Sequence, residues 1–221
     1  MSGNKASLNT LKEQLKGMGE NAFTIPNILS IIRIILIPVF VLLFQSGKYL
    51  PAVIVIFVSG LTDLFDGKIA RHFNQISKLG MLLDPAADKL TQIALTVLMF
   101  FHFHSSKDEV LKAFSYVFLL FCVKELTMIV GSFILLSMDI VPEAAVIYGK
   151  VATFTFYCVM GLLLLFAPGF GTLSAYVTLP HGAIVVLVTI SAVLTVVAFC
   201  SYIPDTVNKV RKKTKENEEQ S

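Results

Sequence analysis

The chain has 221 residues, of which 55% are hydrophobic and only 15% are charged. Soluble domains average about a quarter charged residues, so this composition argues against an ordinary water-soluble domain. The net charge of +3 comes without a basic stripe, which excludes a nucleic-acid surface as the expected function. The charges gather in a few short segments between long apolar runs, and this pattern is typical of an all-α membrane protein with several spans.

Residues 1–22 predict an amphipathic helix that lies on the membrane lipid surface. Leu8, Leu11, Leu15 and Met18 recur at steps of three to four residues, and charged residues stand between them. A disordered leader is the alternative interpretation of this segment.

Residues 23–205 predict six transmembrane helices with short links, so that successive helices would be antiparallel neighbours in one bundle. The approximate spans are Ile25–Phe44, Leu50–Ala70, Met81–Phe103, Val110–Leu136, Ala144–Phe166 and Ile184–Ile203. Pro51 and Pro85 are expected within the first turns of their helices, where a proline costs no backbone hydrogen bond. Residues 206–221 are expected to form a charged tail.

The lysines and arginines predict the orientation. The N-terminal segment, the connection between the second and third spans, and the tail carry most of them and would lie on one side. The loop 168–181 carries none and would lie on the other side. The positive-inside rule therefore predicts a cell-membrane protein with both termini and this connection in the cytoplasm.

The clearest chemical pattern spans the end of the second predicted helix and the start of the third. It consists of Asp63, Asp66, Gly67, Ala70, Arg71, Gly80, Asp84 and Asp88. Asp63, Asp66 and Ala70 share one helical face, and Asp84 and Asp88 share a face of the next helix. Because the connection between the helices is short, both carboxylate pairs are expected at the cytoplasmic end of the bundle.

Four aspartates at a membrane boundary repel one another and require a cation. Ligation by oxygen alone favours a hard cation such as Mg²⁺ or Mn²⁺, which keeps positions open for phosphate oxygens. Gly67 and Gly80 leave room for a nucleotide, and Arg71 offers a fork for phosphate. Structural carboxylates paired with nearby cations are one alternative. A cation transporter is another, but it does not explain the glycines, Ala70 and Arg71 at these gaps.

These gaps, D-x2-D-G-x2-A-R-x8-G-x3-D-x3-D, resemble the signature of the CDP-alcohol phosphatidyltransferase family, and the resemblance reaches most of the chain apart from its tails. The resemblance implies a transferase that moves a phosphatidyl group from CDP-diacylglycerol to an alcohol and releases CMP. It also implies that Asp63, Asp66 and Asp84 hold metal, and that Asp88 helps to hold it or acts as the catalytic base.

The same resemblance implies a CDP site and an assembly. The residues assigned to CDP binding are Gly67, Ala70 and Arg71, together with Asp63 and Gly80. Members that resemble this chain are commonly dimers, so a homodimer is expected.

The acceptor is indicated by three further segments. Residues 25–33, with the pattern I-P-N-I-L-S-x2-R, resemble the start of phosphatidylglycerophosphate synthases and of the related cardiolipin synthases, as do residues 124–125 and 149–153. This resemblance implies glycerol 3-phosphate as the acceptor. Many such members have a second basic residue where this chain has Ala152, so phosphatidylglycerol as acceptor remains the alternative. The candidate acceptor-binding residues are Asn27, Arg33, Lys124, Glu125 and Lys150.

Overall fold

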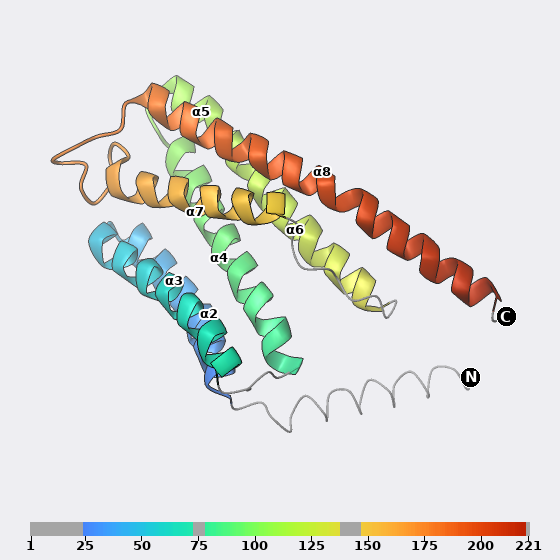
Figure 1. Cartoon of the computed structure of the whole chain (residues 1–221). Helices are drawn as coiled ribbons and strands as arrows, with labels where there is room; N and C mark the ends of the chain where they lie inside the picture. The colour runs from blue at the N-terminus through green and yellow to red at the C-terminus, as the bar shows by residue number, and fades with distance from the viewer. Residues whose placement is uncertain (1–23, 73–77, 138–146, 220–221) are drawn as a thin grey trace, which may run out of the picture. The chain divides into compact units, whose positions relative to one another are not determined.

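The computed structural model describes residues 24–72, 78–137 and 147–219, and every regular element within them is a helix, as predicted. The helices, drawn in Figure 1, are α2 (Ile25–Gln45), α3 (Tyr49–His72), α4 (Lys78–His104), α5 (Glu109–Phe114), α6 (Tyr116–Ser137), α7 (Ile147–Phe166) and α8 (His181–Glu219). Each predicted span falls on a helix, with α5 and α6 sharing the fourth. The predicted amphipathic helix over residues 1–22 lies outside the described residues.

Within the described residues, four helices are long and apolar enough to cross a membrane. Their stretches are Asn27–Gln45, Glu109–Ser132, Ile147–Phe166 and His181–Arg211. α3 contributes a shorter apolar stretch, Tyr49–Thr62. Many large apolar side chains are exposed, such as Leu42 and Phe57, and lipid rather than water is the solvent that suits such surfaces. The plan of six spans in one bundle stays a prediction.

Contacts divide the chain into two compact units, residues 1–91 and 92–221, and the boundary falls inside α4. In the first unit α2 and α3 pack side by side as a hairpin (Figure 1). Its link is short because Gly47 adopts a φ of +72°, which residues with a side chain rarely adopt. The Gly47 and Lys48 amides donate to the carbonyls of Phe44 and Leu43 at 3.1 and 3.0 Å, so α2 ends sharply and α3 returns antiparallel.

In the second unit α8 packs against α7 and α6. Buried aromatic rings fill the interior. The ring centroid of Phe103 lies 5.4 Å from that of Phe118 and 5.8 Å from that of Phe170, while Phe121 and Phe156 are 5.3 Å apart. All five side chains are at most 3% exposed. This aromatic core fixes the spacing of the helices that carry the polar residues described below.

A hydrogen-bonded cap joins the start of α5 to the start of α8. One oxygen of Asp108 accepts the amides of Val110 and Leu111 at 2.8 and 3.1 Å, and the other lies 2.6 Å from Nδ1 of His181. The hydrogen bond from the Leu111 amide, then that from Val110 and the interaction with His181, lower the pKa of the Asp108 carboxyl below its ordinary value.

The prediction that Pro85 lies in a first turn was wrong, because α4 begins at Lys78 and places Pro85 in the helix interior. A proline there cannot donate to the carbonyl of Met81, four residues earlier. By contrast, Pro51 lies in the first turn of α3 as predicted.

The length of α8 also differs from expectation. The helix continues through Pro204 to Glu219, for 39 residues in all. The predicted charged tail, residues 206–221, is therefore an extension of the last helix as far as residue 219.

Candidate active site

The first unit carries a stripe of polar side chains on the first turns of the otherwise apolar helix α2. Asn27, Ser30 and Arg33 follow one another at steps of three residues and are only 1%, 0% and 3% exposed. The side chain of Thr24 caps the helix by accepting the Asn27 amide at 3.4 Å, with Pro26 in the first turn. Buried polar groups need polar partners, so this stripe marks the side of α2 that faces other polar groups.

One contact links this stripe to the aspartate motif. The buried Ser30 hydroxyl donates a hydrogen bond to Oδ1 of Asp84 on α4. Since α2 and α3 form an antiparallel hairpin, the first turns of α2 also lie alongside the last turns of α3. The first turns of α2 therefore adjoin both helices on which the predicted aspartates lie.

The two halves of the aspartate motif fall on consecutive helices. Asp63, Asp66, Gly67, Ala70 and Arg71 lie on the last turns of α3, and Gly80, Asp84 and Asp88 lie on α4. The side chains of Asp84 and Asp88 are half-buried. Those of residues 63–72 and 78–82 lie outside the described part of the chain.

The donor set of the described half fits a hard cation in its chemistry. Asp84 and Asp88, one helical turn apart, supply only oxygen, and a serine hydroxyl orients one of them. Among the side chains that are described, no group of three or more histidines, cysteines or acidic residues could hold a metal ion. The four-aspartate metal site therefore stays a prediction, as does the CDP site.

A second polar site is a small pocket inside the second unit, to which α4, α6, α7 and α8 contribute. It is lined by Gln92, Phe121, Lys124, Glu125, Ala152, Thr153, Phe156 and Thr195. The Lys124 ammonium donates to Oε1 of Glu125, its neighbour in the chain. The side chain of Lys124 is 21% exposed and that of Glu125 is 4% exposed, so the pocket holds a closely paired and largely buried cation and anion.

The candidate acceptor-binding residues belong to both units of the chain. Lys124 and Glu125 meet in the pocket of the second unit. Asn27 and Arg33 belong to the polar stripe of the first unit, and Lys150 is an exposed residue on the first turn of α7. Ala152, where many glycerophosphate members have a second cation, lines the pocket and is buried.

Sequence reasoning did not include Ser30, Gln92 or Thr195 among the site residues. All three are buried polar residues on apolar helices, at most 5% exposed. The sequence pattern that could have found them is a polar residue about one helical turn away from another polar or charged residue, as Ser30 is from Asn27. That signal indicates a polar face, but it does not say which other helix the face meets.

The helices and the two polar sites define a membrane-embedded protein whose polar chemistry is concentrated on a few faces of apolar helices. Residues 23–198, the greater part of the chain, match the CDP-alcohol phosphatidyltransferase family. The chain belongs to this family.

Curated relatives carry a more specific name. The "CDP-diacylglycerol--glycerol-3-phosphate 3-phosphatidyltransferase" of Blochmanniella floridana is 41% identical over 85 residues, which cover 37% of this chain and 45% of that protein. The protein of the same name from Escherichia coli (strain K12) is 43% identical over 90 residues, covering 38% of this chain and 47% of the relative. The chain thus spans about half the length of the curated relatives it matches.

Proposed function

We propose that the chain transfers a phosphatidyl group from CDP-diacylglycerol to glycerol 3-phosphate, giving phosphatidylglycerophosphate and CMP. The observation that carries this proposal is the aspartate motif at its fixed gaps on α3 and α4, inside the region that matches the family. The name of the relatives supports glycerol 3-phosphate as the acceptor.

In this proposal Asp63, Asp66, Asp84 and Asp88 hold Mg²⁺ or Mn²⁺. The bound cation would offset the carboxylate charges and polarise the pyrophosphate of the donor. The Ser30 hydroxyl fixes the orientation of the Asp84 carboxylate through their hydrogen bond. Gly67, Ala70 and Gly80 leave the nucleotide room to approach the helices, and Arg71 pairs with phosphate.

The chemical step is a displacement at the phosphorus that carries the diacylglycerol. Asp88 takes the proton from the acceptor hydroxyl, and the acceptor oxygen forms a bond to this phosphorus. The bond between the phosphorus and the bridging oxygen breaks, and the electron pair leaves with that oxygen on CMP. The acyl chains of CDP-diacylglycerol stay in the bilayer while its headgroup reacts, which suits a polar site carried by membrane helices.

The pocket of the second unit is the proposed site for the phosphate of the acceptor. Lys124 supplies the cation, and Gln92, Thr153 and Thr195 supply neutral polar groups. A lysine that contacts phosphate at a partly buried position forms a charge-assisted hydrogen bond.

A second candidate acceptor is phosphatidylglycerol, as in cardiolipin synthases, and the charge of the pocket favours it. Glu125 offsets Lys124, and Ala152 adds no second cation. A phosphate monoester carries a charge of about −1.5 to −2 at neutral pH, whereas the terminal glycerol of phosphatidylglycerol is uncharged. A neutral pocket is better matched to the uncharged group.

Three features of the organisation belong to the same proposal. They are six spans in one bundle with an interfacial N-terminal helix, a homodimer, and a cell-membrane location with both termini and the active site in the cytoplasm. The distribution of lysine and arginine supports the orientation. The resemblance to the family supports the six-span plan and the homodimer.

The test is CMP release by the purified full chain in lipid vesicles that contain CDP-diacylglycerol. Release is expected only with Mg²⁺ or Mn²⁺ and an acceptor, with glycerol 3-phosphate preferred to phosphatidylglycerol and to glycerol. Asp63→Asn, Asp66→Asn and Asp84→Asn are each expected to lower the rate by at least about a thousandfold, because a cation stabilises the transition state by several kcal/mol. Glu109→Gln removes an exposed carboxylate outside the motif and is the matched control.

Three other outcomes of the CMP-release assay would change the proposal. A preference for phosphatidylglycerol would select the second candidate. Full rates of CMP release in EDTA would contradict the proposed requirement for a metal ion. The absence of CMP release with every acceptor tested would overturn the proposed activity.

A further inference from the structure

The last part of α8 is longer than a membrane span needs. A helix rises about 1.5 Å per residue, so 39 residues extend over about 58 Å, roughly twice the thickness of the hydrocarbon core. About 20 residues are enough to cross, and the residues from His181 to Cys200 are almost all apolar or small. A crossing that begins at His181 is complete by about Cys200, so the later part of the candidate span His181–Arg211 is available to lie at the bilayer surface.

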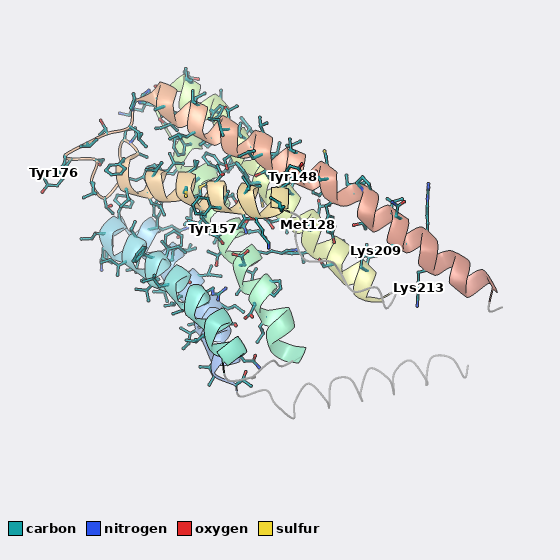
Figure 2. The ribbon with its side chains drawn as sticks, in the orientation of Figure 1. Met128, Tyr148, Tyr157, Tyr176, Lys209 and Lys213 are labelled. Atoms are coloured by element: carbon teal, nitrogen blue, oxygen red, sulfur yellow. The ribbon has the colours of Figure 1, made fainter. Side chains whose placement is uncertain are left out.

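This extension has one apolar face flanked by cations. Ile203, Val207 and Val210 are spaced i, i+4 and i+7 and share a face, on which Ile203 and Val207 are 46% and 42% exposed. The lysines labelled in Figure 2 on this stretch, Lys209 and Lys213, lie on one flank of the face by helical geometry, and Arg211 lies on the other.

On the part of the helix that a crossing does not need, an exposed valine and isoleucine would be costly in water, and the flanking cations indicate what should cover them. A helix with an apolar face bordered by lysine and arginine lies in the plane of the bilayer surface, with the cations among the headgroups. Basic residues next to a span are attracted by anionic lipids, which are concentrated in the cytoplasmic leaflet. The acidic run 216–219 would be repelled, so docking involves only residues 203–213.

A proline stands at the place where a bend is required. Pro204 lies inside α8, at the start of the extension, and cannot donate to the carbonyl of Cys200. Prolines are where helices bend sharply, so a bend here would turn the extension from the direction of the span toward the membrane plane.

We propose that residues 203–213 of α8 form a docking surface for anionic lipid headgroups, which bends at Pro204 and lays its apolar face on the bilayer. This inference is independent of the proposed transferase activity. It assigns the cations of the extension a lipid-binding role at the surface of the membrane that the protein spans.

The chain contains no tryptophan, so one introduced tryptophan reports on its position alone. The full-length Val207→Trp variant is reconstituted in phosphatidylcholine vesicles with and without phosphatidylglycerol. With the anionic lipid, we expect its emission to shift to shorter wavelength and to be quenched by spin-labelled lipid. Asn208→Trp, one residue along and on the polar face, is the matched control and should remain water-exposed in both vesicles.

The cations are tested in the same assay. Each basic residue near an anionic surface contributes a factor of about five, so replacing Lys209, Arg211 and Lys213 together by glutamine should lower the ratio of docked to undocked helix about a hundredfold. A water-exposed emission of Val207→Trp in anionic vesicles would overturn the proposal. So would a short-wavelength emission that spin-labelled lipid does not quench, because protein rather than lipid would then cover the face.

Discussion

Ser30 illustrates how one buried hydroxyl can control a carboxylate. It is fully buried and donates to Asp84, and a neighbour that orients a metal-binding carboxylate is typically worth a factor of about 10–100 in metal affinity or activity. We therefore expect Ser30→Ala to raise the Mg²⁺ concentration for half-maximal CMP release by about 10–100-fold. Ser30→Thr keeps the hydroxyl and should remain close to the parent. An alanine variant with the parent's Mg²⁺ dependence would limit Ser30 to a packing role.

Lys124 and Lys150 are both candidate acceptor cations, but they lie in different environments. Lys124 lines the pocket and Lys150 is exposed. Losing a charge-assisted contact to phosphate costs about 1.5–3 kcal/mol, so Lys124→Gln should raise the KM for glycerol 3-phosphate by about 10–100-fold. Lys150→Gln is the matched control and should leave this KM nearly unchanged.

Removal of Lys124 also leaves Glu125 without its cation, and the two effects need to be separated. In the double variant Lys124→Gln, Glu125→Gln the repulsion by the carboxylate is gone, so a remaining rise in KM measures the lost lysine contact. The KM for CDP-diacylglycerol should not change in any of these variants. Equal effects at Lys124 and Lys150 would count against the pocket as the acceptor site.

The candidate site could be predicted only in part, and individual residues show why. The aspartates were found because carboxylates are costly near a membrane and because their gaps are fixed. Ser30 was in a segment singled out for Asn27 and Arg33, yet its bond to Asp84 joins residues 54 positions apart, and nothing local predicts that pairing. The same holds for Gln92 and Thr195, which reach one pocket from different helices.

At the scale of single elements, Gly171 marks a close approach of the backbone in the link between α7 and α8. A Cβ atom there would lie 2.6 Å from the backbone nitrogen of Ala167 and 2.7 Å from its carbonyl oxygen. Overpacking against backbone costs about 1–3 kcal/mol, so Gly171→Ala should lower Tm by several degrees. Gly182→Ala places its methyl group in open space and should not change Tm appreciably. Thermal unfolding in detergent compares the two, and equal Tm values would mean that the link relaxes freely.

The cap formed by Asp108 makes stability depend on pH in a definite direction. Its pKa is lowered in the folded protein, so its stabilising contribution is present above the ordinary value of 3.8 and is lost as the pH falls through the folded value. Asp108→Asn keeps the capping ability but not the charge. The Tm difference between parent and variant should therefore be largest near neutral pH and shrink below pH 3.8. A difference that does not change with pH would assign the effect to shape rather than charge.

Helix positions were predictable because an apolar run of about 20 residues has few other structures available to it in a membrane. The ends of helices were less predictable. α4 begins before Pro85 because packing can compensate for one missing hydrogen bond, and α8 continues after Pro204 although the sequence becomes polar. In both cases the surrounding helix overrode the local preference of a proline.

At the scale of the whole chain, residues 23–198 match the family, and the six-span region 23–205 stays a prediction. The sequence indicated this range because apolar runs and charged links alternate within it. How the parts are arranged depends on contacts between distant helices, and hydropathy does not encode those. The division of contacts within α4, between residues 91 and 92, was accordingly not expected.

The short link between α2 and α3 has a consequence for how the protein enters the membrane during synthesis. α3 has an apolar stretch of only 14 residues, Tyr49–Thr62, followed by Asp63 and Asp66, and alone it would partition poorly into lipid. α2 is strongly apolar, and only residues 46–48 separate the two helices. A tether of three residues keeps α3 beside α2, so we expect the two helices to enter the membrane together as one hairpin. The free energy that α2 gains in lipid would then offset the cost of bringing Asp63 and Asp66 to the membrane boundary, where they are predicted to lie.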